Sequence, residues 1–313
     1  MSIKNELWVD KWRPKTLEDY VWINDTQRLQ VEDWIKNKDI PHFLLSGGPG
    51  VGKSSLAKLL MAILEIDPSD VKFVNASHHT GVDFVRDLTG FAETMPSGDM
   101  RYVILDEADR LSLQAQDALK SMIEEYSNNC RWILTTNRPH KITGPLHSRF
   151  AQGFHIEGLD REQFITKVAT ILITEGVDLT GEKFGILDEY VSVTYPDLRK
   201  CINLLQANCK SGELLRPIGS SAGSMTEYMI GAVALFKNNK IHEARKLICA
   251  NASDNDFEEI YKLLYQNLNW WGTTEEAQNK AIVIIANRLR DHTLVAIPEL
   301  NFAACCIELS MLQ

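Results

Sequence analysis

Residues 42–54 read HFLLSGGPGVGKS, in which a short apolar run breaks into glycines followed by Lys53 and Ser54. The spacing G-x-x-x-x-G-K-S, placed after a strand-like run and before a helical pattern over 54–64, is that of a phosphate-binding loop. Its glycines let backbone N–H groups turn toward the β- and γ-phosphates at a helix N-terminus, where the helix dipole favours an anion. A glycine-rich turn without function is the alternative. We predict a nucleoside triphosphate site with the loop ligands Gly48, Gly50, Val51, Gly52, Lys53, Ser54 and Ser55.

A second apolar run, at 101–109, reads RYVILDEAD and ends in carboxylates. At the end of a strand, Asp106 is placed to hold a water on Mg²⁺, which the Ser54 hydroxyl would also bind. Glu107 points past the metal and can orient or deprotonate the water that attacks the γ-phosphate. Taken alone, such a cluster is more typical of an acidic loop edge. Paired with the glycine-rich loop, it indicates a Walker B strand.

The chain of 313 residues is long enough for two or three domains. Its formal net charge of −9 argues against a wholly basic surface for nucleic acid, but leaves room for a local basic patch. The six cysteines form no Cys-x-x-Cys pair, so we expect reduced thiols without disulfide or zinc. With no signal-like apolar segment and no stretch long enough to span a bilayer, we expect a cytoplasmic protein without a membrane partner.

Strand-length apolar runs alternate with helical patterns in the first half of the chain, at 42–46, 71–75, 101–106, 130–136 and 153–157. This alternation predicts an α/β fold with a parallel five-stranded sheet. Between two of the runs, residues 111–126 form an amphipathic helical pattern that places Leu119 and Ile123 inward and Gln116, Lys120 and Glu124 outward.

After residue 158 the strand signal stops, and helical patterns cover 161–175, 183–194 and 197–209. Turn-forming residues are frequent over 211–224, as in a linker. The remaining chain is again helical in pattern, and its apolar helices are of the kind that pack against neighbours. We therefore predict three domains, namely a nucleotide-binding domain at 1–158, a small helical domain at 159–212 and a C-terminal helical domain at 225–313, whose helices pack either within the domain or between subunits.

Three further polar residues lie where nucleotide chemistry needs them. Asn137 follows the run 130–136 and can bond both the γ-phosphate and the attacking water, if that strand lies between those bearing Gly47 and Asp106. Arg149 is far from its own loop and suited to a neighbour's γ-phosphate, as an arginine finger is. Arg199 starts a helix of the second domain and can fold onto the nucleotide. The predicted catalytic set is Lys53, Glu107, Asn137, Arg149 and Arg199.

Together these motifs resemble the AAA+ ATPases, and more narrowly the sliding-clamp loaders. Residues 7–19, LWVDKWRPKTLED, resemble the opening of replication factor C small subunits, and residues 73–77 and 82–86 resemble the T-even-type phage clamp loader large subunit. Where the family has Ser-Arg-Cys, this chain has Phe150 after the arginine. In that family the N-terminal segment wraps the adenine, which implies contacts from Val9, Asp10, Lys11, Trp12 and Val21.

The resemblance implies a RecA-like AAA+ domain, a helical lid and an all-helical C-terminal collar. It implies several copies of the chain, with ATP and Mg²⁺ bound between neighbours and a distinct companion subunit that completes a pentamer. Such an assembly opens a sliding clamp, places it on primer–template DNA and releases it upon hydrolysis. The compartment would be the host cytoplasm if the chain is encoded by a phage.

Loading must be insensitive to sequence, so DNA contacts are expected at phosphates. We predict Arg86 first and Lys120 second; solvated surface charge is the alternative for each. Phe91 and Met95 are candidates for an apolar plug that binds the clamp, although such spacing is more often core. His78, His79 and Asp83 form no tetrahedral set by spacing and are expected to be loop residues.

Two rival functions share these motifs. Residues 106–109 read DEAD, as in DEAD-box helicases, but such a helicase needs a second RecA-like domain where this chain is helical in pattern. A scaffold that binds ATP without hydrolysis is disfavoured by the presence of Glu107, Asn137 and Arg149.

Overall fold

The computed structural model describes residues 6–77, 81–150, 152–181, 183–216 and 225–312. The chain divides into two compact units. The first, called here the nucleotide unit, contains residues 1–167 and 196–200; the second contains 168–195 and 201–313.

The nucleotide unit is built on one parallel sheet with the strand order β2-β3-β4-β1-β5. Its strands are β1 (Phe43–Gly47), β2 (Val71–Asn75), β3 (Arg101–Asp106), β4 (Cys130–Thr136) and β5 (Gln152–Ile156). Every residue of β1 is buried, as expected for a central parallel strand covered on both faces. The predicted five-stranded parallel sheet is confirmed.

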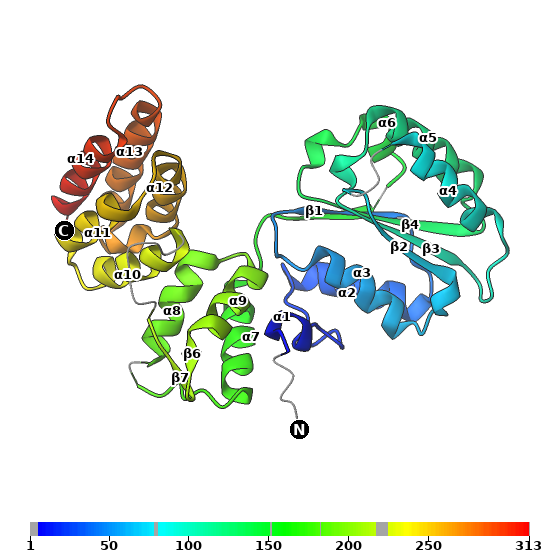
Figure 1. Ribbon diagram of the computed structural model, residues 1–313, viewed down its shortest axis with the longest axis horizontal. Helices are drawn as coiled ribbons and strands as arrows, with labels where there is room; N and C mark the ends of the chain where they lie inside the picture. The colour runs from blue at the N-terminus through cyan, green and yellow to red at the C-terminus, as the bar shows by residue number, and fades with distance from the viewer. Residues whose placement is uncertain (1–5, 78–80, 151, 182, 217–224, 313) are drawn as a thin grey trace. The chain divides into compact units, whose positions relative to one another are not determined.

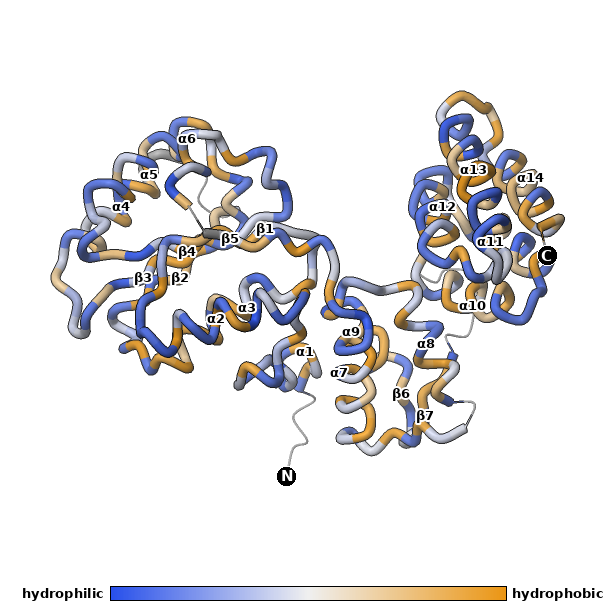
Figure 2. The backbone as a smooth tube through the Cα atoms, turned by 180° about the vertical axis from the view of Figure 1, so that it is seen from behind, coloured by the Kyte–Doolittle hydropathy of each residue, from blue (hydrophilic) through white to orange (hydrophobic). Residues whose placement is uncertain are grey.

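Helices cover both faces of this sheet. Figures 1 and 2 show α2 and α3 on one face and α4, α5 and α6 on the other. The helices of this part are α1 (Trp8–Lys11), α2 (Asp25–Asn37), α3 (Lys53–Ile63), α4 (Val82–Glu93), α5 (Leu113–Glu125) and α6 (Gly144–His147), with short 3₁₀ turns at Pro68–Asp70, Ala108–Arg110 and Pro139–Lys141. Apolar side chains of α4, α5, β3 and β4 form one core cluster.

Helix α5 differs from its sequence prediction in one respect. Leu119 and Ile123 face the core as expected, but Gln116, which we expected outside, is 1% exposed. Its amide nitrogen donates to the carbonyls of Leu111 (3.3 Å) and Lys141 (3.1 Å), and its carbonyl accepts from the backbone N–H of Thr143 at 2.8 Å. Because these bonds satisfy the amide, the cost of burying it is offset. Helical spacing alone does not reveal such partners.

Beyond the sheet, three helices follow at the predicted places: α7 (Arg161–Thr174), α8 (Lys183–Thr194) and α9 (Leu198–Asn208). A small antiparallel hairpin then pairs β6 (Cys209–Lys210) with β7 (Glu213–Leu214). The sequence analysis expected no strand after 158, and this expectation is wrong at the hairpin. Strands of two residues are too short to produce an alternating pattern, so the turn-forming residues dominate the sequence signal.

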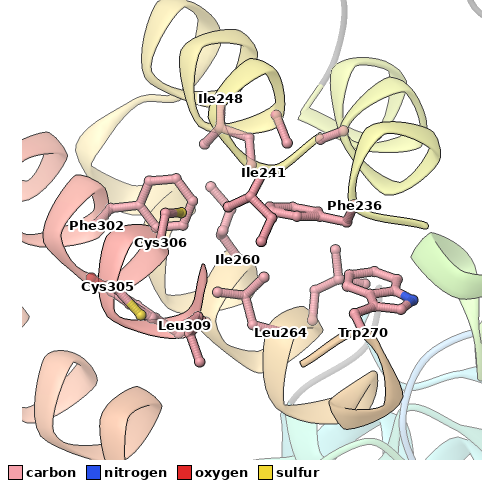
Figure 3. Packing of buried hydrophobic residues seen from close by; sticks show 14 of the residues in the cluster. Phe236, Ile241, Ile248, Ile260, Leu264, Trp270, Phe302, Cys305, Cys306 and Leu309 are labelled. Carbon is pink, nitrogen blue, oxygen red and sulfur yellow. The ribbon is translucent and has the colours of Figure 1, made fainter. Parts of the chain in front are cut away.

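The C-terminal helices enclose an apolar core, called here the collar cluster (Figure 3). The helices are α10 (Met225–Lys237), α11 (Ile241–Asn251), α12 (Phe257–Gln266), α13 (Glu275–His292) and α14 (Pro298–Ser310), with 3₁₀ turns at Asp254–Asp256 and Leu268–Trp270. Phe302 stacks at an angle on Phe257, with ring centroids 5.5 Å apart, and Cys305 and Cys306 are buried free thiols. The predicted helical character of this region is confirmed, whereas the three domain boundaries stay predictions.

Candidate nucleotide-binding site

The glycine-rich loop joins β1 to the N-terminus of α3, as the motif requires. Gly50 has φ +69°, and a Cβ there would lie 1.7 Å from a carboxylate oxygen of Asp197. Gly52, which precedes α3, has φ +92°. Residues that carry a side chain rarely adopt these positive φ angles, so the loop needs glycine at both positions. The contact with Asp197 also brings the start of α9 against the loop.

Lys53 is folded back onto its own loop. Its ammonium group donates to the carbonyls of Gly47 at 3.0 Å and Gly48 at 2.5 Å, and the residue is 7% exposed. Burial lowers the pKa of Lys53 to about 8, Asp106 opposes this shift and Arg199 adds to it. Arg199 itself is exposed at the start of α9. The loop therefore carries a desolvated cation with a second cation, Arg199, close enough to influence it.

The two predicted metal ligands meet. The Ser54 hydroxyl donates to an Asp106 carboxylate oxygen at 2.6 Å, and the Thr135 hydroxyl donates to the same oxygen. A hydroxyl and a carboxylate in contact at the phosphate loop fit Mg²⁺, which prefers oxygen ligands and keeps waters and substrate phosphates in its shell. Within the described ranges, no three or more His, Cys, Asp or Glu side chains gather as a metal-binding group. The predicted residues thus fit a nucleotide-dependent Mg²⁺ site.

Glu107 and Asn137 lie at the ends of neighbouring strands. Strand β4 lies between β3 and β1, which meets the condition set for Asn137. Glu107 has φ +56°, its N–H donates to the Thr135 hydroxyl at 3.3 Å, and its carboxylate lies 3.8 Å from the Arg110 guanidinium. Asp109 is buried and accepts from the Asn137 N–H at 3.3 Å.

Sequence reasoning missed the supporting polar residues, which are Thr135, Thr136 and Asp109. Thr136 donates to Asp109 at 2.8 Å and thereby links the end of β4 to the turn after β3. A signal was available, because polar residues that end a buried strand need a partner at the same edge of the sheet.

Arg149 follows the short helix α6, and Phe150 anchors this turn in the core at 4% exposure. The Arg149 guanidinium donates to the Ser148 hydroxyl at 2.9 Å and forms an ion pair with Glu124 of α5. Both partners of that pair are solvent-accessible. Arg149 is therefore not brought to its own phosphate loop by any contact described for it.

The N-terminal segment predicted to contact adenine forms α1 and a following stretch without regular structure that contains turns and bends. Asp10 pairs with Arg13 at 2.7 Å, and Lys11 lies 5.7 Å from the ring centroid of Trp12. Val9 is half-buried and Val21 is 6% exposed. Tyr20, which the sequence analysis did not select, packs against Gly52 of the loop.

The predicted DNA and clamp residues lie on α4, on α5 and in the loop after α4. Arg86 is exposed on α4, and Lys120 is half-buried on α5. Phe91 is half-buried, with the Arg101 guanidinium 4.5 Å from its ring centroid, whereas Met95 is 79% exposed. His78 and His79 lie outside the described residues.

The comparisons with known proteins agree with this geometry. A profile of the ATPase family associated with various cellular activities (AAA) matches residues 43–157, which run from the start of β1 to just past β5. A RuvB mutant from Thermotoga maritima superimposes with a TM-score of 0.51 at 17% identity, covering 63% of this chain and 65% of that chain. This likeness shows the fold alone. No helix among the described residues is both long and apolar enough to cross a membrane.

Similarity to curated proteins extends beyond the sheet. A replication factor C small subunit from Methanococcus maripaludis is 34% identical over 279 residues, covering 86% of this chain and 81% of that protein. One from Archaeoglobus fulgidus is 37% identical over 216 residues, covering 67% of this chain and 66% of that protein. The chain therefore belongs to the replication factor C small subunit family of AAA ATPases.

Proposed function

We propose that this chain is an ATP-hydrolysing subunit of a sliding-clamp loader, which opens a ring clamp, places it on primer–template DNA and releases it upon hydrolysis. Relatives named replication factor C small subunits support the loader role. The observation that supports the hydrolytic role is the 2.6 Å hydrogen bond from Ser54 to Asp106, because the hydroxyl and the carboxylate that we propose as Mg²⁺ ligands lie together at the phosphate loop, and Glu107 follows Asp106 in the chain. Within the family, residues 73–77 and 82–86 favour kinship with the T-even phage loaders.

In this mechanism the loop N–H groups hold the phosphates, and Lys53 exchanges its bonds to the Gly47 and Gly48 carbonyls for the β- and γ-phosphates. Bound Mg²⁺ would be held by Ser54 and Asp106 and would neutralise the charge that develops on the phosphates. Glu107 takes the proton of the attacking water, and Asn137 holds that water and the γ-phosphate in line. Arg199 senses the nucleotide from the start of α9, while Val9, Asp10, Lys11, Trp12 and Val21 surround the base.

Arg149 would act on a neighbouring subunit. To reach a neighbour's γ-phosphate, its guanidinium has to leave Glu124, which exchanges one charge-assisted contact for another. Sites shared in this way need further copies of the chain, and a distinct companion subunit would complete a pentamer. The helical region 225–313 is the proposed collar of that assembly, after a nucleotide-binding domain at 1–158 and a lid at 159–212.

For the other partners, we propose that Arg86 and Lys120 contact DNA phosphates and that Phe91 and Met95 contact the clamp. The exposure of Met95 supports its role more strongly than the position of Phe91, whose ring is covered by Arg101. A DEAD-type helicase is disfavoured, since the described residues after β5 form helices and one small hairpin in place of a second parallel sheet.

The test is a steady-state ATPase assay of the assembled loader, with and without clamp and primed DNA. We expect both together to stimulate hydrolysis by the wild-type chain. Lys53→Ala should abolish nucleotide binding, whereas Glu107→Gln should bind ATP normally, lose about 10²- to 10⁴-fold in turnover and trap the clamp on DNA unreleased. Wild-type turnover by Glu107→Gln, or hydrolysis that ignores clamp and DNA, would contradict the proposal.

A further inference from the structure

Tyr20 has a buried polar atom that the protein leaves unused. The residue is 5% exposed, and its ring packs edge-on against Trp22 with centroids 4.7 Å apart. Its hydroxyl oxygen has no hydrogen-bond partner among the residues that the structure describes. A buried hydroxyl without a partner destabilises the fold and is rare in native proteins, so each instance calls for an explanation.

The position of this hydroxyl supplies one. A Cβ built on Gly52 would lie 3.0 Å from Cε2 of Tyr20 and 3.2 Å from its hydroxyl oxygen. The hydroxyl thus lies beside the last glycine of the phosphate loop, directly before Lys53.

The segment around Tyr20 is held firmly. The N–H of Trp22 donates to the Gln163 side chain at 3.1 Å, and the carbonyl of Trp22 accepts from the N–H of Asp160 at 2.9 Å. Val21, which lies between Tyr20 and Trp22 in the sequence, is buried and is one of the residues proposed to contact the base. The Tyr20 ring therefore lies beside Gly52 of the phosphate loop, and Tyr20 is next in sequence to Val21, which is assigned to the base.

We propose that the Tyr20 hydroxyl hydrogen-bonds the nucleoside part of bound ATP and thereby contributes to nucleotide specificity. This inference rests on the proposed ATP binding. Burial raises the pKa of Tyr20 well above its usual value, so the group stays a neutral hydroxyl that can donate or accept. Binding of ATP then supplies the partner that the protein itself does not.

The test uses Tyr20→Phe in the full chain, because phenylalanine keeps the ring and removes only the hydroxyl. Without nucleotide, the thermal midpoint should rise, since an unpartnered buried polar group has been removed. The affinity for ATP should fall by about tenfold, the worth of one hydrogen bond with a buried partner. A tyrosine that merely fills space would not move these two quantities in opposite directions.

Two controls locate the effect. Inorganic tripolyphosphate should bind wild type and Tyr20→Phe equally, because it lacks the nucleoside. Tyr102→Phe removes the hydroxyl of another buried tyrosine. Tyr102 lies near the N-terminal end of β3, whereas the phosphate loop follows the C-terminal end of the parallel strand β1, so this variant should leave ATP affinity unchanged. Titrations with 2′-deoxy-ATP and ITP then assign the partner to the sugar or to the base. The difference in affinity between wild type and Tyr20→Phe should disappear for the analogue that lacks the group bound by the Tyr20 hydroxyl.

Equal ATP affinity of Tyr20→Phe and wild type, or a lower midpoint without nucleotide, would overturn the inference. So would an equal loss of affinity for tripolyphosphate, which would place the hydroxyl on the phosphates. A wild-type chain that binds no ATP would overturn the proposed function itself, so the two failures are distinguishable.

Discussion

Polar side chains are buried both in the nucleotide unit and beside the collar cluster, but their roles differ. In the nucleotide unit, Lys53, Asp109 and Thr136 lie together where the parallel strands end. In the collar cluster, the buried Asn301 donates to the Tyr261 hydroxyl at 3.0 Å and to the Arg288 carbonyl at 2.7 Å, and so ties α12, α13 and α14 together.

The difference lies in which contacts a ligand can replace. The contacts of Lys53 with loop carbonyls and of Ser54 with Asp106 join groups that ATP and Mg²⁺ would bind. Those of Asn301 join parts of the protein that must remain together. Substitutions at the strand ends should therefore change chemistry more than stability, and substitutions in the collar cluster should do the reverse.

The largest expected effect is that of Arg149→Ala. A trans-acting arginine contributes about 10³- to 10⁵-fold to the rate of phosphoryl transfer, so hydrolysis by the assembled loader should fall by that factor. Its ion pair with Glu124 is solvent-accessible, so unfolding free energy should change by no more than about 1 kcal/mol. Turnover measurements and urea unfolding of the same variant test both halves of this statement.

Mixing variants tests whether Arg149 acts between subunits. An assembly doped with Lys53→Ala subunits contains interfaces that pair an intact Arg149 with the intact loop of an Arg149→Ala neighbour. Partial recovery of hydrolysis is expected. If no mixture recovers any activity, Arg149 does not act in trans.

The collar cluster should show the opposite behaviour. Phe302 is fully buried, with its ring 5.5 Å from Phe257 and 6.0 Å from Tyr261, centroid to centroid. Phe302→Ala leaves a cavity and should cost about 3–5 kcal/mol of unfolding free energy, while the ATP affinity of the folded chain stays unchanged. Leu300→Ala on the same helix removes a side chain that is 67% exposed and should cost less than about 0.5 kcal/mol.

The sequence predicted the elements that leave a regular pattern, but it did not predict side-chain contacts between residues that are distant in the chain. The sheet was predictable because its strands are apolar runs, and the loop because its spacing is fixed by phosphate geometry. The contacts of Gln116 and Tyr20 were not, since each depends on groups that are distant in sequence and carry no periodic signal. The β6–β7 hairpin was missed because its strands contain only two residues each.

A pH titration sharpens the account of the loop. Burial lowers the pKa of Lys53 to about 8, and phosphate binding requires the charged ammonium. Binding above pH 8 must therefore take up a proton, and ATP affinity should fall by up to about tenfold per pH unit. Calorimetry at pH 8.5 in buffers of different ionisation enthalpy measures this uptake directly. In Lys53→Arg the guanidinium stays charged, so its affinity should be flat over the same range.

The smallest expected effect is that of Arg86→Ala, which changes the exposed surface of α4 and leaves both buried cores intact. Arg86 lies exposed on α4, and a contact with a DNA phosphate releases about one counterion without reading a base. Arg86→Ala should therefore weaken binding to primed DNA equally for any sequence, and reduce the log–log salt slope by roughly one unit for each contacting copy. ATP affinity and unfolding free energy should not change.

Lys36→Ala is the matched control, because Lys36 is exposed on α2, across the sheet from α4 (Figure 1). The measurement is a salt titration of DNA affinity with clamp and a non-hydrolysable ATP analogue present. If Arg86→Ala and Lys36→Ala give the same slope as wild type, the α4 surface does not face DNA. A reduced slope for Arg86→Ala alone would show that DNA is bound through phosphates on the face of the sheet that α4 and α5 cover.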